Sequence, residues 1–297
     1  MESSKVLSIQ PIQDVWSAAW LEIQKRTGTP EIEIPFLPAL SEKVWGLHRK
    51  EMMVVGARTS QGKTTFALQL AYQCAKQGFR THFLSLEMSP EQLVERLFCQ
   101  VCRISNYELL INPHTYEQRA KEFSEFLKDL PLIPMYKIGS TIHEVFKLIE
   151  SIPADVIILD YVQAIRNMEF DRLSIINDYI LKFRELCVSK NMAGVMISQI
   201  NRGAMEDRER MPQLWHLKAS GALEEIADQV LLLHWPYFYS GKDEEHSDFK
   251  VIIAKNRNGM LGTVEATFEP SYYVIGEKRP GSGKGSPGYK YPGYQED

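Results

Sequence analysis

The stretch at residues 57–64, Ala-Arg-Thr-Ser-Gln-Gly-Lys-Thr, limits the folds open to this chain more than any other feature. An apolar run at residues 52–56 precedes it, and a segment of helix-forming composition begins near Lys63. Strand, loop and helix in this order are typical of a phosphate-binding loop, whose backbone N–H groups and helix N-terminus form a concave positive site. In such a loop Lys63 reaches the β- and γ-phosphates, and Thr64 places its hydroxyl on Mg²⁺. We therefore predict a nucleotide-binding α/β domain.

The match to the usual pattern G-x-x-x-x-G-K-[ST] is slightly degenerate, because Ala57 holds the first position and Gly56 stands one residue earlier. Alanine still allows the turn. An ordinary turn before a helix is the alternative, and the flanking strand and helix disfavour it. The candidate nucleotide contacts are Ala57, Arg58, Thr59, Ser60, Gln61, Gly62, Lys63, Thr64 and Thr65.

Length and composition predict a globular protein, because 297 residues with 44% hydrophobic residues can bury a sizeable core. The formal net charge of -4 gives no global positive field, so contact with nucleic acid would depend on local clusters of Lys and Arg. No stretch reaches the ~18 consecutive apolar residues of a membrane span, and the N-terminus leads into no apolar signal core. We expect a cytoplasmic protein with no membrane partner.

The cysteines are few for this length, which fits reduced thiols better than a disulfide scaffold. Cys99 and Cys102 have the spacing of metal ligands. No second pair or histidine cluster accompanies them, and Phe98 and Val101 indicate a helix. We therefore predict buried free thiols rather than zinc.

The N-terminal segment, residues 1–45, is expected to be an amphipathic helix followed by a linker arm. Residues 11–26 carry apolar side chains spaced three and four apart, which predicts the helix. Residues 27–30 break it, and residues 31–50 carry prolines and few periodic cues, as a linker would. Two interpretations of the helix stay open: it packs on its own core, or it docks on a neighbouring subunit.

Strands and helices then alternate, which predicts a largely parallel sheet flanked by helices. From Asp228 onward, strands joined by short turns suggest an antiparallel extension on the C-terminal side. Residues 277–297 are rich in Gly, Pro and Ser, so we expect a flexible tail. The expected strands are residues 81–86, 132–136, 156–160, 194–199, 230–235, 249–254 and 262–268, and the expected helices are residues 89–103, 115–128 and 171–189, with a further helix opening at residues 140–144.

Two carboxylates, Glu87 and Asp160, each follow an apolar strand, at the sheet edge where open α/β sheets bind ligands. Hydrolysis of a γ-phosphate needs a carboxylate that positions water and a Mg²⁺ ion near the phosphates. An acidic residue after a strand can also be only a helix cap. The phosphate-binding loop favours the catalytic interpretation of both.

Six ordered blocks stand out along the chain: residues 56–65, 85–89, 159–163, 198–202, 218–221 and 254–259. Together they resemble the DnaB-type replicative helicases, specifically their RecA-like ATPase domain. The resemblance covers residues 46–275, and the order and spacing of the blocks make chance a poor explanation. We expect the RecA-like P-loop NTPase core to span residues 46–276.

The resemblance implies a RecA-like fold with ATP and Mg²⁺ as ligands. It also implies that Lys255 and Arg257 enter the nucleotide site of the next subunit, so that a homo-oligomeric ring, expected to be a hexamer, forms the catalytic unit. By position, it assigns Lys63 to phosphate, Thr64 and Asp160 to Mg²⁺, Glu87 to water activation and Gln199 to sensing of the γ-phosphate.

The resemblance further implies a central channel for single-stranded DNA, lined by Arg202, Lys218, Ser220 and Gly221. Lys218 stands where the family commonly has Arg, and His216 replaces a usual acidic residue, so these positions depart from the pattern. A loader or a primase is a candidate partner. Residues before 46 are too few for the family's helical N-terminal domain, so we infer no docking through that domain.

The expected function is that of an ATP-dependent, ring-forming DNA helicase motor that translocates on single-stranded DNA in replication. One alternative is a recombinase-like or regulatory DNA-binding ATPase without unwinding activity. Another is a non-enzymatic ring component, against which the intact Glu87 argues.

Overall fold

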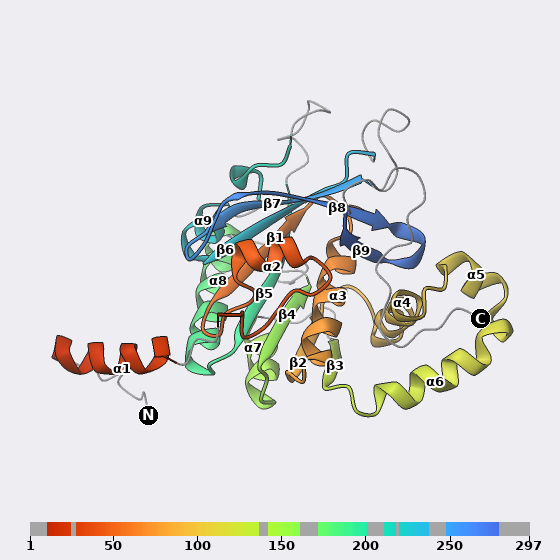
Figure 1. Ribbon diagram of the computed structural model, residues 1–297, viewed down its shortest axis with the longest axis horizontal. Coiled ribbons are helices and arrows are strands. Elements are labelled where there is room, and N and C mark those ends of the chain that lie inside the picture. The colour runs from red at the N-terminus through yellow and green to blue at the C-terminus, as the bar shows by residue number, and fades with distance from the viewer. Residues whose placement is uncertain are drawn as a thin grey trace.

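A computed structural model describes residues 11–24, 28–136, 142–160, 172–200, 211–217, 220–237 and 248–278. These residues form a nine-stranded sheet with the order β3-β2-β4-β5-β1-β6-β7-β8-β9 (Figure 1). The strands from β3 to β6 pair in parallel, and β7, β8 and β9 extend the sheet in antiparallel fashion, as predicted. The strands are β1 (Met52–Ala57), β2 (Thr81–Ser85), β3 (Leu132–Tyr136), β4 (Val156–Asp160), β5 (Ala193–Gln199), β6 (Gln229–His234), β7 (Asp248–Asn256), β8 (Gly262–Glu269) and β9 (Val274–Glu277).

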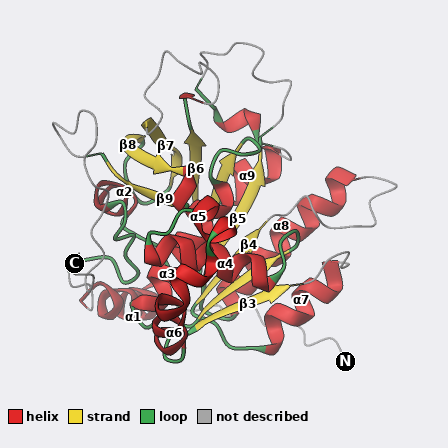
Figure 2. Cartoon of the chain, turned by 90° about the vertical axis from the view of Figure 1, so that its right-hand side faces the viewer, coloured by secondary structure: helices red, strands yellow, loops and turns green. Residues whose placement is uncertain are grey.

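Helices cover the sheet, and the alternation of side chains along each strand divides the core into two layers. In β1, Met53 and Val55 pack on one side with α3 and α4, whereas Met52 and Val54 pack on the other side with α7 and α8 (Figure 2). Burial on both sides explains why the central strands read as continuous apolar runs. The helices are α1 (Ile12–Gln24), α2 (Pro38–Val44), α3 (Lys63–Lys76), α4 (Pro90–Cys102), α5 (Asn106–Ile111), α6 (Glu117–Leu127), α7 (Ile142–Ser151), α8 (Arg172–Ser189) and α9 (Ser220–Ile226), with short 3₁₀ turns η1 (Pro113–Tyr116), η4 (Leu214–His216) and η5 (Pro270–Tyr272).

The segment expected to be a linker is part of the folded domain. Ile32, Ile34 and Phe36 are buried, and Phe36 packs edge-on against Phe66 of α3, with 5.4 Å between ring centroids. A bridge between Ile32 and Leu47 closes the segment on itself, and α2 lies within it. The expectation of an arm up to residue 45 therefore needs correction: residues 32–44 contribute to the main core.

Helix α1 forms where the spacing predicted it, but its apolar side chains are exposed. Ile12 is 84% exposed, Trp16 58% and Trp20 46%, and the two tryptophan rings stack on each other with centroids 5.8 Å apart. Figure 1 shows the helix standing clear of the sheet. The interpretation that α1 packs on its own core is wrong.

Several other features refine the sequence predictions. β3 is an edge strand, which accommodates Pro134 without the loss of an interior ladder bond. Cys99 and Cys102 are buried free thiols on α4, as predicted.

In the part of the chain that the structure describes, no helix is both long and apolar enough to cross a membrane. The tail that we expect to be flexible lies outside the described residues from position 279 onward.

Candidate nucleotide site

The predicted phosphate-binding loop lies between β1 and α3, as the sequence requires. Ser60 and Gly62 have positive φ angles of 64° and 75°, so the backbone turns sharply before the helix. Gly62 is the N-cap of α3 and has no side chain to occupy the first N–H groups of the helix. A side-chain carbon at this position would also approach the ring of Phe268 to 3.5 Å. The loop thus presents backbone N–H groups to an anion at the helix N-terminus.

Polar side chains of the loop and of β5 meet at the mouth of this turn. The Lys63 ammonium group donates to the carbonyl oxygen of Arg58 at 2.8 Å, within the loop itself. Gln199, the last residue of β5, donates from Nε2 to the Thr59 hydroxyl at 2.5 Å. A phosphate in the loop would offer Lys63 an anionic partner and would lie within reach of the Gln199 amide.

Asp160 ends β4 beside the loop and is only 4% exposed. Burial is the chief cause that raises its pKa to about 6, and Glu87 raises it further, whereas a hydrogen bond with the Thr64 side chain and the charge of Lys63 lower it. The Asp160 carboxylate, the Thr64 hydroxyl and the Lys63 ammonium group therefore lie close enough to interact. Two oxygen ligands beside a phosphate site fit Mg²⁺, which is usually bound through one or two protein groups, phosphates and water. Among the described residues, no group of three or more His, Cys, Asp or Glu side chains forms an alternative metal site.

Glu87 is positioned by the turn that follows β2. The Ser85 hydroxyl accepts the backbone N–H groups of Glu87 at 3.4 Å and Met88 at 2.8 Å, and Ser89 then caps α4 in a capping box with Gln92. Because β2 and β4 are neighbours in register, Glu87 and Asp160 emerge at the same edge of the sheet. This placement agrees with the roles that the sequence suggests for both.

These groups line a single cavity of about 550 Å³, a size typical of small-molecule sites. Thr59, Ser60, Gly62, Lys63, Thr64 and Thr65 line it together with Glu87, Asp160 and Gln199. Ala57 is buried at the end of β1, and Arg58 and Gln61 belong to the loop but not to the cavity wall.

The aromatic residues that line the cavity were missed by sequence reasoning. Arg96 of α4 lies over the Tyr273 ring, 5.0 Å from its centroid, and Trp235 packs edge-on against Phe268 at 5.1 Å. All four side chains line the cavity, with Met88, Gln92 and Pro270. Flat and apolar surfaces of this kind suit a nucleobase. Only the fold reveals them, because β6, β8 and η5 are remote from the loop in sequence.

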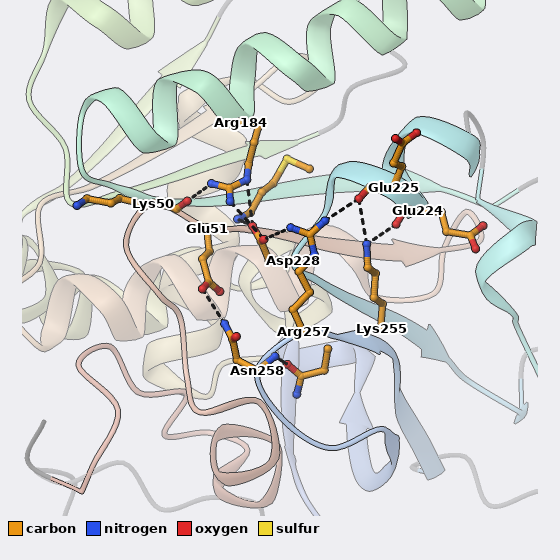
Figure 3. Close-up of polar contacts among 11 residues, drawn as sticks. Lys50, Glu51, Arg184, Glu224, Glu225, Asp228, Lys255, Arg257 and Asn258 are labelled. Carbon is orange, nitrogen blue, oxygen red and sulfur yellow. Dashed lines mark hydrogen bonds and ion pairs between the residues drawn. The ribbon is translucent and has the colours of Figure 1, made fainter. Parts of the chain in front are cut away.

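Lys255 and Arg257 do not line this cavity in their own chain. They lie at the end of β7, which runs antiparallel to β6, and Arg257 bonds to Asp228 beside Met52 at the start of β1 (Figure 3). The phosphate-binding loop follows the opposite end of β1, roughly 17 Å away at a rise of about 3.3 Å per residue. Burial is the chief cause that lowers the pKa of Lys255, and the charge of Arg257 adds to it.

The predicted DNA contacts are only partly described. Arg202 and Lys218 lie outside the described residues, and Ser220 and Gly221 begin α9. A bridge between Ile200 and Leu217 joins the two ends of the segment that contains Arg202. His216 is buried, and its Nδ1 accepts the N–H of Gln213 at 2.9 Å, so this departure from the family pattern serves the fold.

A family model described as "DnaB-like helicase C terminal domain" matches residues 36–276. The chain belongs to this family. Among relatives of the DnaB-like chain, the replicative DNA helicase DnaC of Bacillus subtilis is 28% identical over 240 residues, which cover 76% of this chain and 52% of the relative. The replicative DNA helicase DnaB of Geobacillus stearothermophilus gives the same identity and coverage. The chain thus spans about half the length of the relatives it matches.

Solved structures show the same fold as this DnaB-like domain. A DnaB-like replicative helicase, whose structure was described with its interactions with primase, superposes with a TM-score of 0.79 and 21% identity, covering 91% of this chain and 72% of the other. A separate ATPase domain superposes with a TM-score of 0.82 and 21% identity, covering 92% of this chain and all of the other. These likenesses confirm the predicted α/β architecture with its antiparallel extension.

Proposed function

We propose that this chain is the ATP-hydrolysing motor of a ring-shaped DNA helicase that moves along single-stranded DNA in replication. One observation carries the proposal: the phosphate-binding loop, Glu87, Asp160 and Gln199 surround a single cavity, although they come from separate elements of the sheet. The family to which the chain belongs is named for helicases, and its relatives are named replicative DNA helicases. Fold and site therefore support the same activity.

Each side chain has a role in γ-phosphate hydrolysis. The backbone N–H groups of the loop and Lys63 hold the phosphates, and Glu87 orients water and accepts its proton. Gln199 detects whether the γ-phosphate is present, because its amide lies beside Thr59 of the loop. Thr64 and Asp160 would hold Mg²⁺, which supplies charge neutralisation at the phosphate oxygens when bound.

The positions of Lys255 and Arg257 support catalysis across a subunit interface. Both lie at the end of the sheet opposite to the loop of their own chain. Both also donate to the Glu225 carbonyl, so their cationic groups lie together. An Arg supplied from a neighbour is worth ~10³ to 10⁵ in phosphoryl transfer. We propose a homo-oligomeric ring, a hexamer, in which these two residues complete the site of the adjacent subunit.

The exposed apolar stripe of α1 supports the same assembly. Trp16, Trp20 and Ile12 remain accessible in the isolated chain, and a second copy of the chain would cover them. This is the arm interpretation that the sequence left open.

Single-stranded DNA is the proposed track, and a primase or a loader is the proposed protein partner. Membership of the DnaB-like helicase family supports DNA binding. The Ile200–Leu217 bridge and the start of α9 also lie close in the sequence to the proposed DNA contacts. Arg202, Lys218, Ser220 and Gly221 are these proposed contacts. Support for a primase comes from the related structure described with one.

The test separates nucleotide binding from turnover. Lys63→Ala should lose affinity for a fluorescent ATP analogue, because a ground-state phosphate contact is removed. Glu87→Gln should keep this affinity and lose phosphate release, because water activation is removed. Phosphate release by Glu87→Gln at the wild-type rate would overturn the catalytic assignment.

Mixing variants tests the shared site. Arg257→Ala and Glu87→Gln subunits should each be inactive alone, but a mixed ring contains interfaces that pair an intact Glu87 with an intact Arg257. ATPase activity should therefore reappear. No recovery in rings shown to be mixed would contradict catalysis across the interface.

A further inference from the structure

Asp228, the residue that precedes β6, is a buried carboxylate with donors from three parts of the chain (Figure 3). Its side chain is 4% exposed. Oδ2 accepts the Met52 N–H at 2.8 Å and Arg184 Nε at 3.1 Å, and Oδ1 accepts Arg257 Nη1 at 2.9 Å. The carboxylate thus joins β1, α8 and the end of β7.

The Arg257 guanidinium is fixed at two of its nitrogens. Nη1 donates to Asp228, and Nη2 donates to the carbonyl oxygen of Glu225 at 2.9 Å. The guanidinium is planar, so two bonds from different nitrogens determine its orientation. The side chain is nevertheless 48% exposed, and a guanidinium has five N–H donors, so it can still bind an anion from outside the subunit.

Lys255 is held against the same helix end. Its ammonium group donates to the carbonyl oxygen of Glu224 and, at 3.2 Å, to that of Glu225. These carbonyls belong to the last turn of α9, where helix carbonyls have no partner within the helix and favour cations. Lys255 and Arg257 therefore share the Glu225 carbonyl, and the end of α9 holds them together.

We propose that Asp228 is the positioning residue for Arg257: with the last turn of α9, it holds the guanidinium in the orientation needed by the neighbouring subunit's γ-phosphate. This inference rests on the proposed function, in which Arg257 acts across the interface. Donors that are already oriented need no rearrangement when charge develops in the transition state. Asp228 does not line the nucleotide cavity, so in this proposal it affects turnover through Arg257.

The competing explanation is that Asp228 only ties β1 to α8 and β6. Arg184 provides a matched control, because it bonds to the same carboxylate from α8 and does not contact Arg257 in the described contacts. If Asp228 mattered only because it connects α8 to the sheet, Arg184→Met would lower turnover as much as Asp228→Asn does. If orientation of Arg257 matters, Arg184→Met would leave turnover near that of the wild type.

The first measurement is steady-state ATPase activity of the assembled protein. Asp228→Asn should lower kcat about ten- to a hundredfold, the same range as the loss when the partner that orients a metal-binding side chain is removed. KM for ATP should not change, because the cavity of the same chain is untouched. A wild-type kcat in Asp228→Asn, or an equal loss in Arg184→Met, would overturn the proposal.

The second measurement is complementation in mixed rings. Asp228→Asn subunits retain their own Glu87, so mixing them with Glu87→Gln subunits should restore activity. Mixing them with Arg257→Ala subunits should not, because neither variant then supplies an oriented Arg257. If Asp228→Asn instead damages the nucleotide cavity of its own chain, the pattern is reversed. Activity would then return only with Arg257→Ala subunits, which supply an intact cavity, and this result would overturn the proposal.

Two further controls keep the outcomes distinct. Failure of Arg257→Ala and Glu87→Gln to complement each other would contradict the shared site itself rather than the role of Asp228. If Asp228→Asn does not fold, the double variant Asp228→Asn/Arg184→Met removes the unpaired buried cation and should show the same complementation pattern. A double variant with wild-type kcat would count against the proposal.

Discussion

Replacement of Asp160 by Asn should stabilise the protein while it abolishes Mg²⁺-dependent turnover. Burial raises the pKa of Asp160 from 3.8 to about 6, so the charged carboxylate is disfavoured in the folded state. At 1.36 kcal/mol for each pKa unit, the ionised form costs about 3 kcal/mol of folding free energy. Asparagine resembles the neutral acid in shape and removes this cost.

The pH dependence follows from the direction of the shift. The pKa of Asp160 is higher in the folded state than in the unfolded state. Below pH 3.8 the carboxyl is neutral in both states and does not destabilise the wild type. As the pH rises to about 6, ionisation of Asp160 increasingly lowers the free energy of unfolding. The advantage of Asp160→Asn should therefore be about 3 kcal/mol at pH 7.5, smaller by about half at pH 5, and nearly absent below about pH 3.

The assay is urea unfolding without Mg²⁺ or nucleotide, at pH 7.5 and pH 5. Asp155→Asn is the matched control of opposite sign, because hydrogen bonding to Arg80 is the main cause that lowers the pKa of Asp155. That variant should be less stable than the wild type at pH 7.5. An Asp160→Asn protein that is no more stable than the wild type at pH 7.5 would show that burial of the ionised carboxylate does not destabilise the fold.

Two further predictions concern partners. Single-stranded DNA should bind mainly through its phosphates, so its affinity for the protein should fall steeply as the salt concentration rises. Lys218→Ala should flatten the slope of log K against log salt concentration by roughly one unit. An unchanged slope in salt titrations would show that Lys218 does not contact the DNA. The double variant Trp16→Ser/Trp20→Ser removes most of the exposed apolar stripe of α1. At a given protein concentration, light scattering should therefore report assemblies of lower mass than for the wild type. An unchanged mass would contradict docking of α1 on a neighbouring subunit.

The elements that can be predicted from the sequence are those whose cause is local. The loop at Gly62 and Lys63 follows from a turn between an apolar strand and a helix, and Glu87 and Asp160 follow from strands that end in a carboxylate. The antiparallel strands also carry short-range turn signals. These features need no knowledge of distant neighbours.

The features that could not be predicted depend on contacts between remote segments. Phe36 is buried in the main core, where it packs against Phe66 of α3. Its own segment carries prolines and few periodic cues, so the sequence indicates a linker there. Among the residues that line the cavity, Arg96 lies over the ring of Tyr273, which is far along the chain. The cations Lys255 and Arg257 were predicted, but their anchorage to the end of α9 became visible only once β7 was placed beside β6.

Strand displacement on a forked duplex tests the proposal that this chain couples ATP hydrolysis to movement along DNA. DNA-stimulated phosphate release is measured on the same samples, with Glu87→Gln as the inactive control. The wild-type chain should displace the strand only with ATP and Mg²⁺, and Glu87→Gln should not displace it. Phosphate release stimulated by DNA without any strand displacement would contradict the claim, and would favour a recombinase-like or regulatory ATPase instead.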